Sequence, residues 1–513
     1  MNGNNLKEPR LKPAGYAALI ERYGLDSIPN WHRSFVATAG PHRIVSTEGV
    51  IEETYPPKYW PGESPGDHLE FALKYDGVNP EILSGLFRVA AREDILSYVR
   101  SRPTGKYARR LWYLYELLTG TTLQMDDLKQ GSYVNLLEPK QYYTATPGRR
   151  IRRQRINDNL LGDGRFCPMV RRTDTLHRFE EIDLPSRCRD VVSGYSQELL
   201  TRALDYLYTK ETKSSFEIER ITPTSTRIER FLALLRLAEG EDFCEKARLI
   251  DLQNRIVDPR FSDSDYRKTQ NYVGETIAWQ SEKIHYVCPK PEDLPDLMAG
   301  LIGAHKRMER GGVPAVVHAA IVAYGFVFLH PFEDGNGRIH RFLIHNVLAR
   351  RDFTPDGIMF PVSATMLRNP VDYAASLEAF SRPLMALVEY SLSEDGSMTV
   401  HNDTAQWYRH IDMTQQVEAL FRFIEQTIDT ELVEELVFLA NYDETKRALQ
   451  EIVDMPDRQI DLFIRFCLQN NGRLSSRKRA SHFNYLSEEE IVRMERVIQS
   501  VYEGTGPGDT RAQ

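Results

Sequence analysis

The residues best equipped for chemistry in this chain of 513 residues lie together in one segment, 330–341, which reads HPFEDGNGRIHR. His330 has a side chain whose ordinary pKa suits it to take a proton near neutral pH. Asp334 offers a hard oxygen ligand of the kind that Mg²⁺ prefers. Arg338 and Arg341 stand three residues apart on an expected helical turn, so both guanidinium groups can reach one phosphate chain. This combination favours the transfer of part of a nucleotide to an incoming hydroxyl group.

The glycines of the segment predict how its backbone would hold an anion. Pro331 ends the apolar helix that precedes it, and Gly335 and Gly337 can adopt positive φ and turn successive N–H groups toward one point. The helix expected from Arg338 adds the positive end of its dipole there. We therefore expect Gly335, Asn336 and Gly337 to cradle phosphate groups. Alone, Asp-Gly-Asn-Gly would indicate an ordinary turn, but a turn requires neither the histidine nor the arginine pair.

Helices must position this segment, because apolar residues recur at helical spacing through most of the region 193–392. A hairpin is expected over 272–286, where β-branched and aromatic residues alternate with polar ones. The run 314–329 is too short to cross a membrane and indicates a buried helix. The clearest expected helices cover residues 197–209, 226–238, 294–308, 314–329 and 338–350. The chain is thus predicted to be mainly α.

The region before residues 193–392, residues 1–192, is predicted to be a mixed unit of unknown role. Residues 55–67 are rich in Pro and Gly and must be loop or extended, whereas 106–119 has the pattern of a helix. Five arginines in Arg149–Arg155 could form a phosphate surface. A solvated loop, or a strand that pairs with acidic neighbours, is favoured for that run.

The region after residues 193–392, residues 400–513, is predicted to be helical. Residues 457–468 form an apolar-faced helix, and Ser487 with Glu490 forms a capping box that opens a final helix. The basic run Arg477-Lys478-Arg479 lies between them. This outline also fits a winged-helix module that contacts DNA, although it is common in plain helical regions.

Composition excludes several classes of protein. Lys and Arg number 65 against 73 Asp and Glu, a net charge of −8 that argues against broad nucleic-acid binding. Uncharged apolar runs are too short for a membrane span. Met1–Pro13 is polar, unlike a signal peptide. The five cysteines are scattered and never spaced C-x-x-C, which favours reduced thiols in a cytoplasmic protein. The short apolar runs in turn predict no membrane partner.

The segment 330–341 resembles the signature of the Fic (filamentation-induced-by-cAMP) family, H-P-F-x-D-G-N-G-R-x-x-R, at all nine fixed positions. The resemblance covers roughly 193–392 and implies a Fic-type helical core with a short β-hairpin flap. It implies a protein adenylyltransferase, which moves AMP from ATP to a Ser, Thr or Tyr hydroxyl of a target protein. The implied roles are a base for His330, a Mg²⁺ ligand for Asp334, and phosphate ligands for Gly335, Asn336, Gly337, Arg338 and Arg341.

Two flanking stretches also resemble the family. Lys283, Ile284, His285 and Tyr286 match the flap strand, which would pin the backbone of the target by strand addition. The family usually has Pro-Pro after it, where this chain has Cys288-Pro289. Tyr373 matches the tyrosine beside the adenine, although an ordinary half-buried helix tyrosine explains it equally well.

Upstream, Ser215 to Arg220 resembles the inhibitory motif of the family, [S/T]-x-x-x-E-[G/N], on a helix over about 209–220. The resemblance implies that Glu219 pairs with Arg341 and takes the place of the γ-phosphate, so that ATP binds unproductively. A carboxylate can satisfy a guanidinium and exclude another anion. Arg220 departs from the usual Gly or Asn. The alternative is that Glu219 is a solvated helix residue.

Within the family, other outcomes occur. They include removal of AMP from a modified protein, which Glu219 could assist by positioning water, and transfer of another phosphate-linked group. Self-modification is also expected of an enzyme of this kind. A hypothesis of a different class is a DNA-binding regulator that acts through the C-terminal region.

Overall fold

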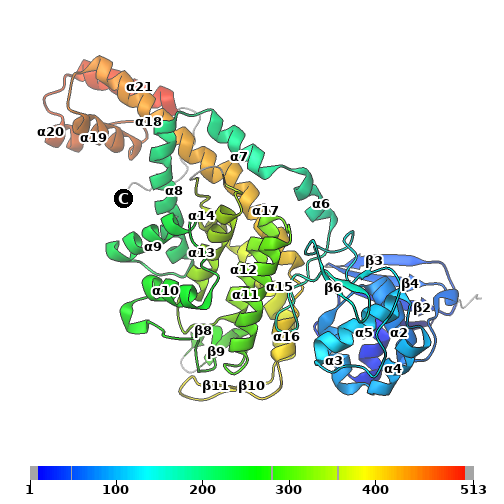
Figure 1. Cartoon of the computed structure of the whole chain (residues 1–513). Helices are drawn as coiled ribbons and strands as arrows, with labels where there is room; N and C mark the ends of the chain where they lie inside the picture. Colours follow the sequence, from blue (N-terminus) through cyan, green and yellow to red (C-terminus); the bar gives the residue numbers. More distant parts are fainter. Residues whose placement is uncertain (1–9, 48, 279–280, 355–357, 503–513) are drawn as a thin grey trace, which may run out of the picture.

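The computed structural model describes residues 10–47, 49–278, 281–354 and 358–502. Figure 1 shows three parts in chain order: a mixed N-terminal part, a large helical centre, and a small helical part at the opposite end. Helices dominate, so the prediction of a mainly α protein is confirmed. Among the described residues, no helix is both long enough and apolar enough to cross a membrane.

The N-terminal part combines a small sheet with helices. The sheet has the order β1-β2-β4-β3, in which β2 and β4 are parallel and the outer pairs antiparallel. The expected helix 106–119 is confirmed as α5, and its apolar face is buried. The elements are β1 (Leu11–Ala14), α1 (Tyr16–Tyr23), β2 (His32–Ala37), β3 (Arg43–Thr47), β4 (Val50–Tyr55), α2 (Pro65–Phe71), α3 (Pro80–Val89), α4 (Arg92–Ser101) and α5 (Lys106–Thr119).

The arginine-rich run pairs with acidic neighbours, as favoured from the sequence. β6 (Arg149–Ile151) pairs with β7 (Ile156–Asp158), which also pairs with β5 (Val134–Asn135). Arg149 lies 3.4 Å from Asp158, and Arg153 lies 3.2 Å from Glu116. These ion pairs engage two of the five arginines, and Arg155 donates to the Lys129 carbonyl at 2.6 Å, so the run is built into the N-terminal part.

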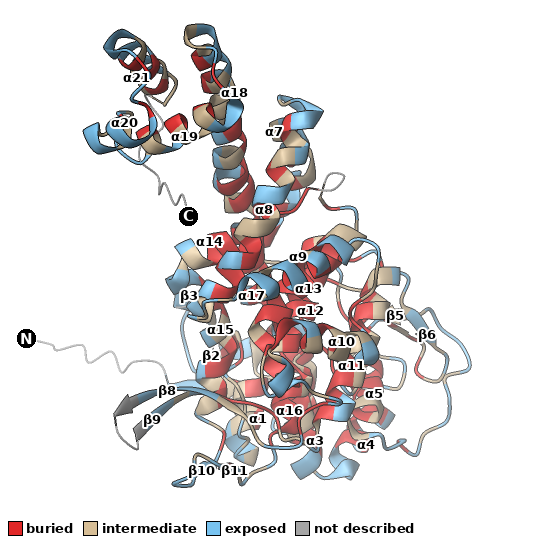
Figure 2. Ribbon diagram, turned by 90° about the vertical axis from the view of Figure 1, so that its left-hand side faces the viewer, coloured by how far each residue is buried: buried red, intermediate tan, exposed pale blue. Residues whose placement is uncertain are grey.

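The centre is built around α12 (Ala315–Leu329), which is buried almost throughout because it is apolar on every side. Figure 2 shows the buried residues concentrated in α12 and its neighbours. The expected helices 197–209, 226–238, 294–308, 314–329 and 338–350 are all confirmed. The helices around α12 are α8 (Gln197–Ile218), α9 (Ser225–Leu237), α10 (Lys246–Ile256), α11 (Leu294–Arg310), α13 (Asn336–Arg350), α14 (Val362–Arg368), α15 (Pro370–Met385), α16 (Ala405–Arg409) and α17 (Thr414–Gln426).

Two hairpins lie at one end of this helical centre. The expected hairpin is confirmed as β8 (Tyr272–Ala278) and β9 (Ser281–Val287), an antiparallel pair that projects from the body in Figure 2. A second, short hairpin joins β10 (Tyr390–Leu392) to β11 (Met398–Val400). The β8–β9 hairpin lies beside the segment 330–341, because the Tyr286 hydroxyl on β9 donates to the Phe328 carbonyl and the Arg267 N–H, before β8, donates to the Pro331 carbonyl.

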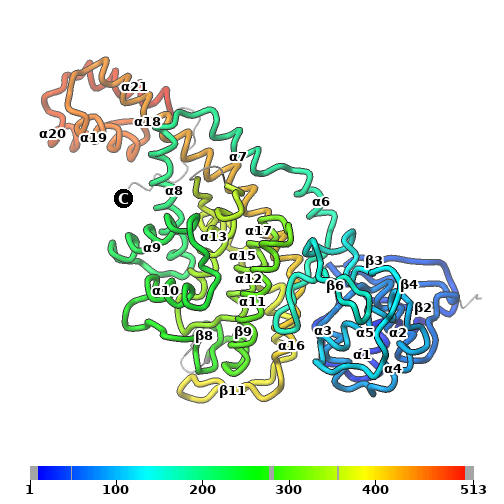
Figure 3. Tube along the Cα trace, in the orientation of Figure 1, coloured from blue at the N-terminus to red at the C-terminus, as the bar shows by residue number. Residues whose placement is uncertain are grey.

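The helix α8 runs from the C-terminal part of the molecule to the loop before α13. Figure 3 traces the chain from the N-terminal part through α6 (Asp174–Glu181) and α7 (Leu184–Ser193) to the start of α8. There α8 packs against α18 (Val433–Ile452), and Arg202 forms an ion pair with Asp443 at 2.7 Å. The other end of α8 reaches the loop before α13, so one helix joins the C-terminal part to the candidate site.

The C-terminal part ends in α19 (Asp457–Leu468), α20 (Ser476–His482) and α21 (Glu488–Tyr502). The expected helix 457–468 and the capping box are confirmed, since the Ser487 hydroxyl accepts from the Glu490 N–H at 3.2 Å. Every element described after β11 is a helix, so the plain helical reading accounts for the described part of this region. The central core includes residues up to Leu439, and a separate apolar cluster begins at Leu449. We propose on this basis that the C-terminal unit begins near residue 440, rather than at 400.

Candidate functional site

The loop between α12 and α13 is shaped by its own side chains. α12 ends at Leu329, and His330 adopts a left-handed conformation with φ 49°. Phe332 is buried in the core and anchors the loop. The Asn336 side chain clasps it, donating from Nδ2 to the Phe332 carbonyl at 2.7 Å and accepting from the Phe332 N–H at 3.1 Å. Asn336 therefore braces the loop with its side chain and leaves only its backbone N–H to face an anion.

The two glycines do different things. Gly335 has φ +92° and makes the turn, as expected. The expectation of positive φ at Gly337 is wrong, because α13 begins at Asn336 and Gly337 lies in its first turn. A Cβ atom at position 337 would instead meet Oε1 of Glu219 at 2.5 Å. A side chain at position 337 would therefore crowd the Glu219 carboxylate, and the first N–H groups of α13 still point out of the helix.

His330 is held as a neutral base. Its Nδ1 lies 3.2 Å from the Val327 carbonyl, which can only accept, so Nδ1 carries the proton and Nε2 keeps its lone pair. Burial, together with the positive charge of Arg267, lowers the pKa of His330 to about 4. This value is below the near-neutral one expected from the sequence, because the sequence does not reveal the burial.

Asp334 lies at the open side of the loop, with its side chain 46% exposed. Its Oδ1 accepts from the Gly335 N–H at 2.6 Å and from Arg338 Nη2 at 2.8 Å. The described residues contain no group of three His, Cys, Asp or Glu side chains arranged around one point. A single accessible carboxylate fits Mg²⁺, which is commonly held by one or two carboxylates together with substrate phosphates.

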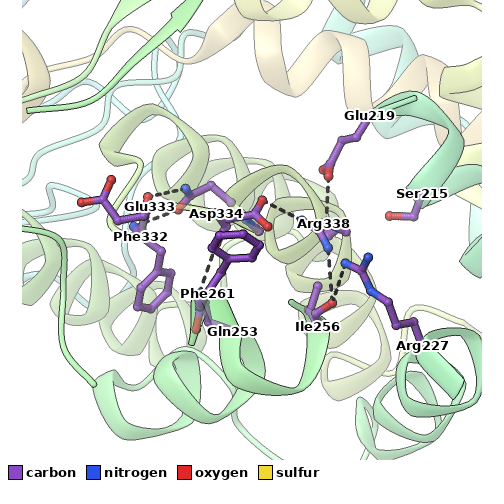
Figure 4. Close-up of polar contacts among 12 residues, drawn as sticks. Ser215, Glu219, Arg227, Gln253, Ile256, Phe261, Phe332, Glu333, Asp334 and Arg338 are labelled. Carbon is purple, nitrogen blue, oxygen red and sulfur yellow. Dashed lines mark hydrogen bonds and ion pairs between the residues drawn. The ribbon is translucent and has the colours of Figure 1, made fainter. Parts of the chain in front are cut away.

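One carboxylate, Glu219, lies between both arginines of the loop. Its Oε1 is 2.8 Å from Arg341 Nη2, and its Oε2 is 2.8 Å from Arg338 Nε. Figure 4 shows the Arg338 guanidinium between Glu219, Asp334 and the Ile256 carbonyl. The expected contact of Glu219 with Arg341 is therefore present, and that with Arg338 is additional. Both guanidinium groups are buried, so this carboxylate compensates charges that water does not reach.

Ser215 holds the second arginine from the same helix. The Ser215 hydroxyl accepts from Arg341 Nε at 2.9 Å, and its carbonyl accepts from Nη2 at 2.6 Å. Burial lowers the pKa of Arg341, but the Glu219 carboxylate and the Tyr373 hydroxyl together outweigh burial and the net shift is upward. Ser215 and Glu219 thus contact one guanidinium from successive turns of α8.

The backbone conformation at Arg220 shows why glycine or asparagine is usual at this position of the motif. α8 ends at Ile218, Glu219 caps it, and Arg220 has φ 57° in the left-handed region. Glycine and asparagine adopt this conformation with little strain, whereas an arginine is strained there. The departure from the motif therefore does not change the local backbone.

Sequence reasoning missed Arg227, on the first turn of α9. Its Nη2 donates to the Ile256 carbonyl at 3.4 Å, the same carbonyl that accepts from Arg338. The Phe216 ring contacts both cations, with its centroid 5.2 Å from Arg227 and 5.4 Å from Arg338. Burial and the charge of Arg338 lower the pKa of Arg227. Nothing in its local sequence distinguishes Arg227 from any other helix arginine.

Tyr373 lies inside the protein, on α15. Its ring stacks on His340 with centroids 6.2 Å apart, and burial raises its pKa. Its hydroxyl interacts with Arg341. Tyr373 thus belongs to the support of the arginine pair, and His340 is equally buried, with a pKa that burial lowers to about 3.

The four residues of the expected flap strand lie in β9 but face different ways. Tyr286 is buried, and its hydroxyl donates to the Phe328 carbonyl. Lys283 and His285 are exposed and lie 3.9 and 3.2 Å from Glu275 on β8, whereas Ile284 is half-buried. Only the backbone and the first three side chains are available to a docked strand.

A comparison with known protein families gives a match over the central helical part. Residues 243–348 match the model of the Fic/DOC family, so the chain contains a Fic domain. "Protein adenylyltransferase Fic" of Culex quinquefasciatus is 33% identical over 23% of this chain and 22% of its own length. The protein of the same name in Drosophila grimshawi is 33% identical over 21% of this chain and 20% of its own length. The chain thus spans about a fifth of the length of these relatives.

Among solved structures, a Fic family protein from Desulfovibrio desulfuricans G20 is 17% identical, with a TM-score of 0.38 over 54% of this chain and 80% of that one.

Proposed function

We propose that this protein is a self-inhibited protein adenylyltransferase, which moves AMP from ATP to a Ser, Thr or Tyr hydroxyl of a target protein and of itself. The observation that carries the proposal is the Glu219 carboxylate between Arg338 and Arg341 at 2.8 Å from each. Two buried cations at a helix N-terminus form a site for a polyanion, and a carboxylate from another helix now occupies it.

In the proposed mechanism, each residue of the loop has one task. The N–H groups of Asn336 and Gly337 at the start of α13 bind the α- and β-phosphates. The guanidinium groups of Arg338 and Arg341 bind the β- and γ-phosphates and stabilise the charge that develops on the leaving pyrophosphate. Asp334 would hold Mg²⁺, which supplies Lewis-acid neutralisation of the same phosphates.

The neutral imidazole of His330 takes the proton of the target hydroxyl at Nε2 as the oxygen attacks the α-phosphate. The bond from that phosphate to the pyrophosphate breaks, and AMP remains on the target. The target backbone would pair with the exposed edge of β9 through its main chain, beside Lys283 and His285.

The proposed inhibition is a competition for the arginines. While Glu219 occupies both guanidinium groups, the γ-phosphate lacks its ligands and the α-phosphate is held out of line with the hydroxyl. A displacement of about 1 Å can cost around 10²-fold in rate.

The test is mass spectrometry and radiolabelled AMP incorporation with MgATP, on wild type, Glu219→Gly, and Glu219→Gly combined with His330→Ala. We expect strong incorporation by Glu219→Gly, and loss of it by roughly 10²–10⁴-fold in the double variant with ATP affinity retained. Absence of AMP from every variant and from added proteins would contradict the proposal. Removal of AMP from a pre-modified sample by wild type alone would support the reverse reaction instead.

A further inference from the structure

Arg267 has an unusual environment for a buried arginine. It lies in the segment before β8 and is 3% exposed. Its guanidinium donates to three backbone carbonyls: from Nε to His330 at 2.8 Å, from Nη1 to Thr269 at 2.7 Å, and from Nη2 to Pro289 at 2.6 Å. Within the part of the chain that the structure describes, no carboxylate lies at ion-pair distance from it. A buried cation without a counter-ion is costly, so its place in the fold calls for a reason.

The three carbonyls belong to three different stretches of the chain. His330 begins the loop of the candidate site, Thr269 leads into β8, and Pro289 follows β9. The Arg267 N–H also donates to the Pro331 carbonyl at 2.8 Å. One residue therefore fixes the start of the loop against both roots of the β8–β9 hairpin. The planar fork of the guanidinium sets these distances more rigidly than an ammonium group would.

We propose that Arg267 is a positioning residue, which sets the base His330 in register with the strand β9 where the target would dock. This inference rests on the proposed function. His330 is in the left-handed region, so its backbone needs an external restraint, and the bond from Arg267 to its carbonyl supplies one.

The charge of Arg267 has a second consequence. After burial, it is the main influence that lowers the pKa of His330, while Asp334 on the same loop acts in the opposite direction. The titratable groups that face Arg267 are Cys288, Glu333, Tyr286 and Tyr408. A neutral residue at position 267 would therefore let the pKa of His330 rise, while burial would still hold it below its ordinary value.

The experiment compares Arg267→Gln, Arg267→Lys and a matched control, Arg109→Gln. Arg109 is 5% exposed and also donates to backbone carbonyls, at 2.8 Å to Gln154 and 2.9 Å to Ser132, but it lies in the N-terminal part. It controls for the general cost of removing a buried guanidinium. Thermal melts and ATP titrations establish which variants remain folded.

The first readout is the titration of His330 by NMR with histidine-selective labelling of the full chain, in which His330→Ala identifies the resonance. We expect a midpoint near 4 for wild type, a clear rise in Arg267→Gln, and little change in Arg267→Lys or Arg109→Gln. An unchanged midpoint in a folded Arg267→Gln overturns the electrostatic part. This readout does not depend on turnover, so it separates failure of this inference from failure of the proposed function.

The second readout is AMP transfer in the Glu219→Gly background. As the pH is lowered, Arg267→Gln should lose activity at a higher pH than the Arg267 protein, because its His330 becomes protonated at a higher pH. Arg267→Lys should keep the pH profile but lose at least tenfold in kcat with ATP affinity unchanged, because its donors share one nitrogen and cannot span the three carbonyls as the guanidinium fork does. A kcat in Arg267→Lys equal to that of the Arg267 protein would overturn the positioning role. The measurement on Arg267→Lys tests this role even if Arg267→Gln does not fold.

Discussion

Gly337 and Glu219 fit each other so closely that a Cβ atom at position 337 would lie 2.5 Å from the Glu219 Oε1. Glu219 comes from the end of α8 and Gly337 from the first turn of α13, 118 positions later in the chain. The absence of a side chain at one position therefore makes room for the carboxylate at the other. This relationship can be measured as a coupling between two substitutions.

We predict that Gly337→Ala destabilises wild type by about 1–3 kcal/mol through overpacking against Glu219. In the Glu219→Gly background the same change should cost much less, because the methyl group then meets no carboxylate. Urea unfolding of the four proteins gives the coupling energy. Equal costs in the two backgrounds would show that Glu219 moves away without loss.

Glu219→Gly should raise AMP incorporation by an order of magnitude or more, because the freed guanidinium groups can then bind the γ-phosphate. The double variant with Arg341→Ala should lose most of the gain, since the proposed mechanism needs that cation. Incorporation of radiolabelled AMP measures both. Equal incorporation by wild type and Glu219→Gly would leave Glu219 with a structural role only.

The same substitution should change how strongly ATP stabilises the protein. Without Glu219, Arg341 remains buried without a carboxylate partner, and the free protein should lose on the order of 3 kcal/mol of stability. MgATP supplies the missing negative charge, so the rise in melting temperature on adding it should be larger in Glu219→Gly than in wild type. A smaller rise would place the phosphates elsewhere.

Asp334→Asn should remove the dependence of ATP binding on Mg²⁺, because the amide is a much poorer ligand for a hard cation. Calorimetric titration with and without Mg²⁺ measures this. Glu333→Gln is the matched control: it is the adjacent carboxylate, it is exposed, and it accepts from the Thr269 hydroxyl. An equal loss in both variants would show that only the charge of the loop matters.

Arg220→Gly should stabilise the protein by about 0.5–1 kcal/mol, because relief of left-handed strain exceeds the entropy that glycine adds to the unfolded chain. Arg230→Gly is the control. Arg230 is an exposed residue inside α9, where glycine should destabilise by about 1 kcal/mol. Thermal unfolding compares the two, and destabilisation by both changes would refute the account of Arg220.

The sequence predicted the helices well because their signals are local. The predicted bounds 106–119 and 457–468 match α5 and α19. The contact of Glu219 with Arg341 followed from a motif with known spacing. The contacts of Arg267 could not be predicted, because a backbone carbonyl has no sequence signature. Nor could the environment of His330, whose partial burial and nearby Arg267 charge lower its pKa, since both depend on segments distant in the chain.

Glu219 caps the end of α8, so loosening of the last turn of this helix would let its carboxylate leave the arginines. In the proposed mechanism, nucleotide and carboxylate then compete for one pair of cations, so the strength of inhibition is a ratio of two populations. If the competent state is present as a small fraction f, the apparent dissociation constant for productive ATP is the intrinsic one divided by f. A change that strains or frays the end of α8, including a force transmitted from α18, would therefore change f. The rate of the proposed AMP transfer would change in proportion to f, although no phosphate-binding residue is altered.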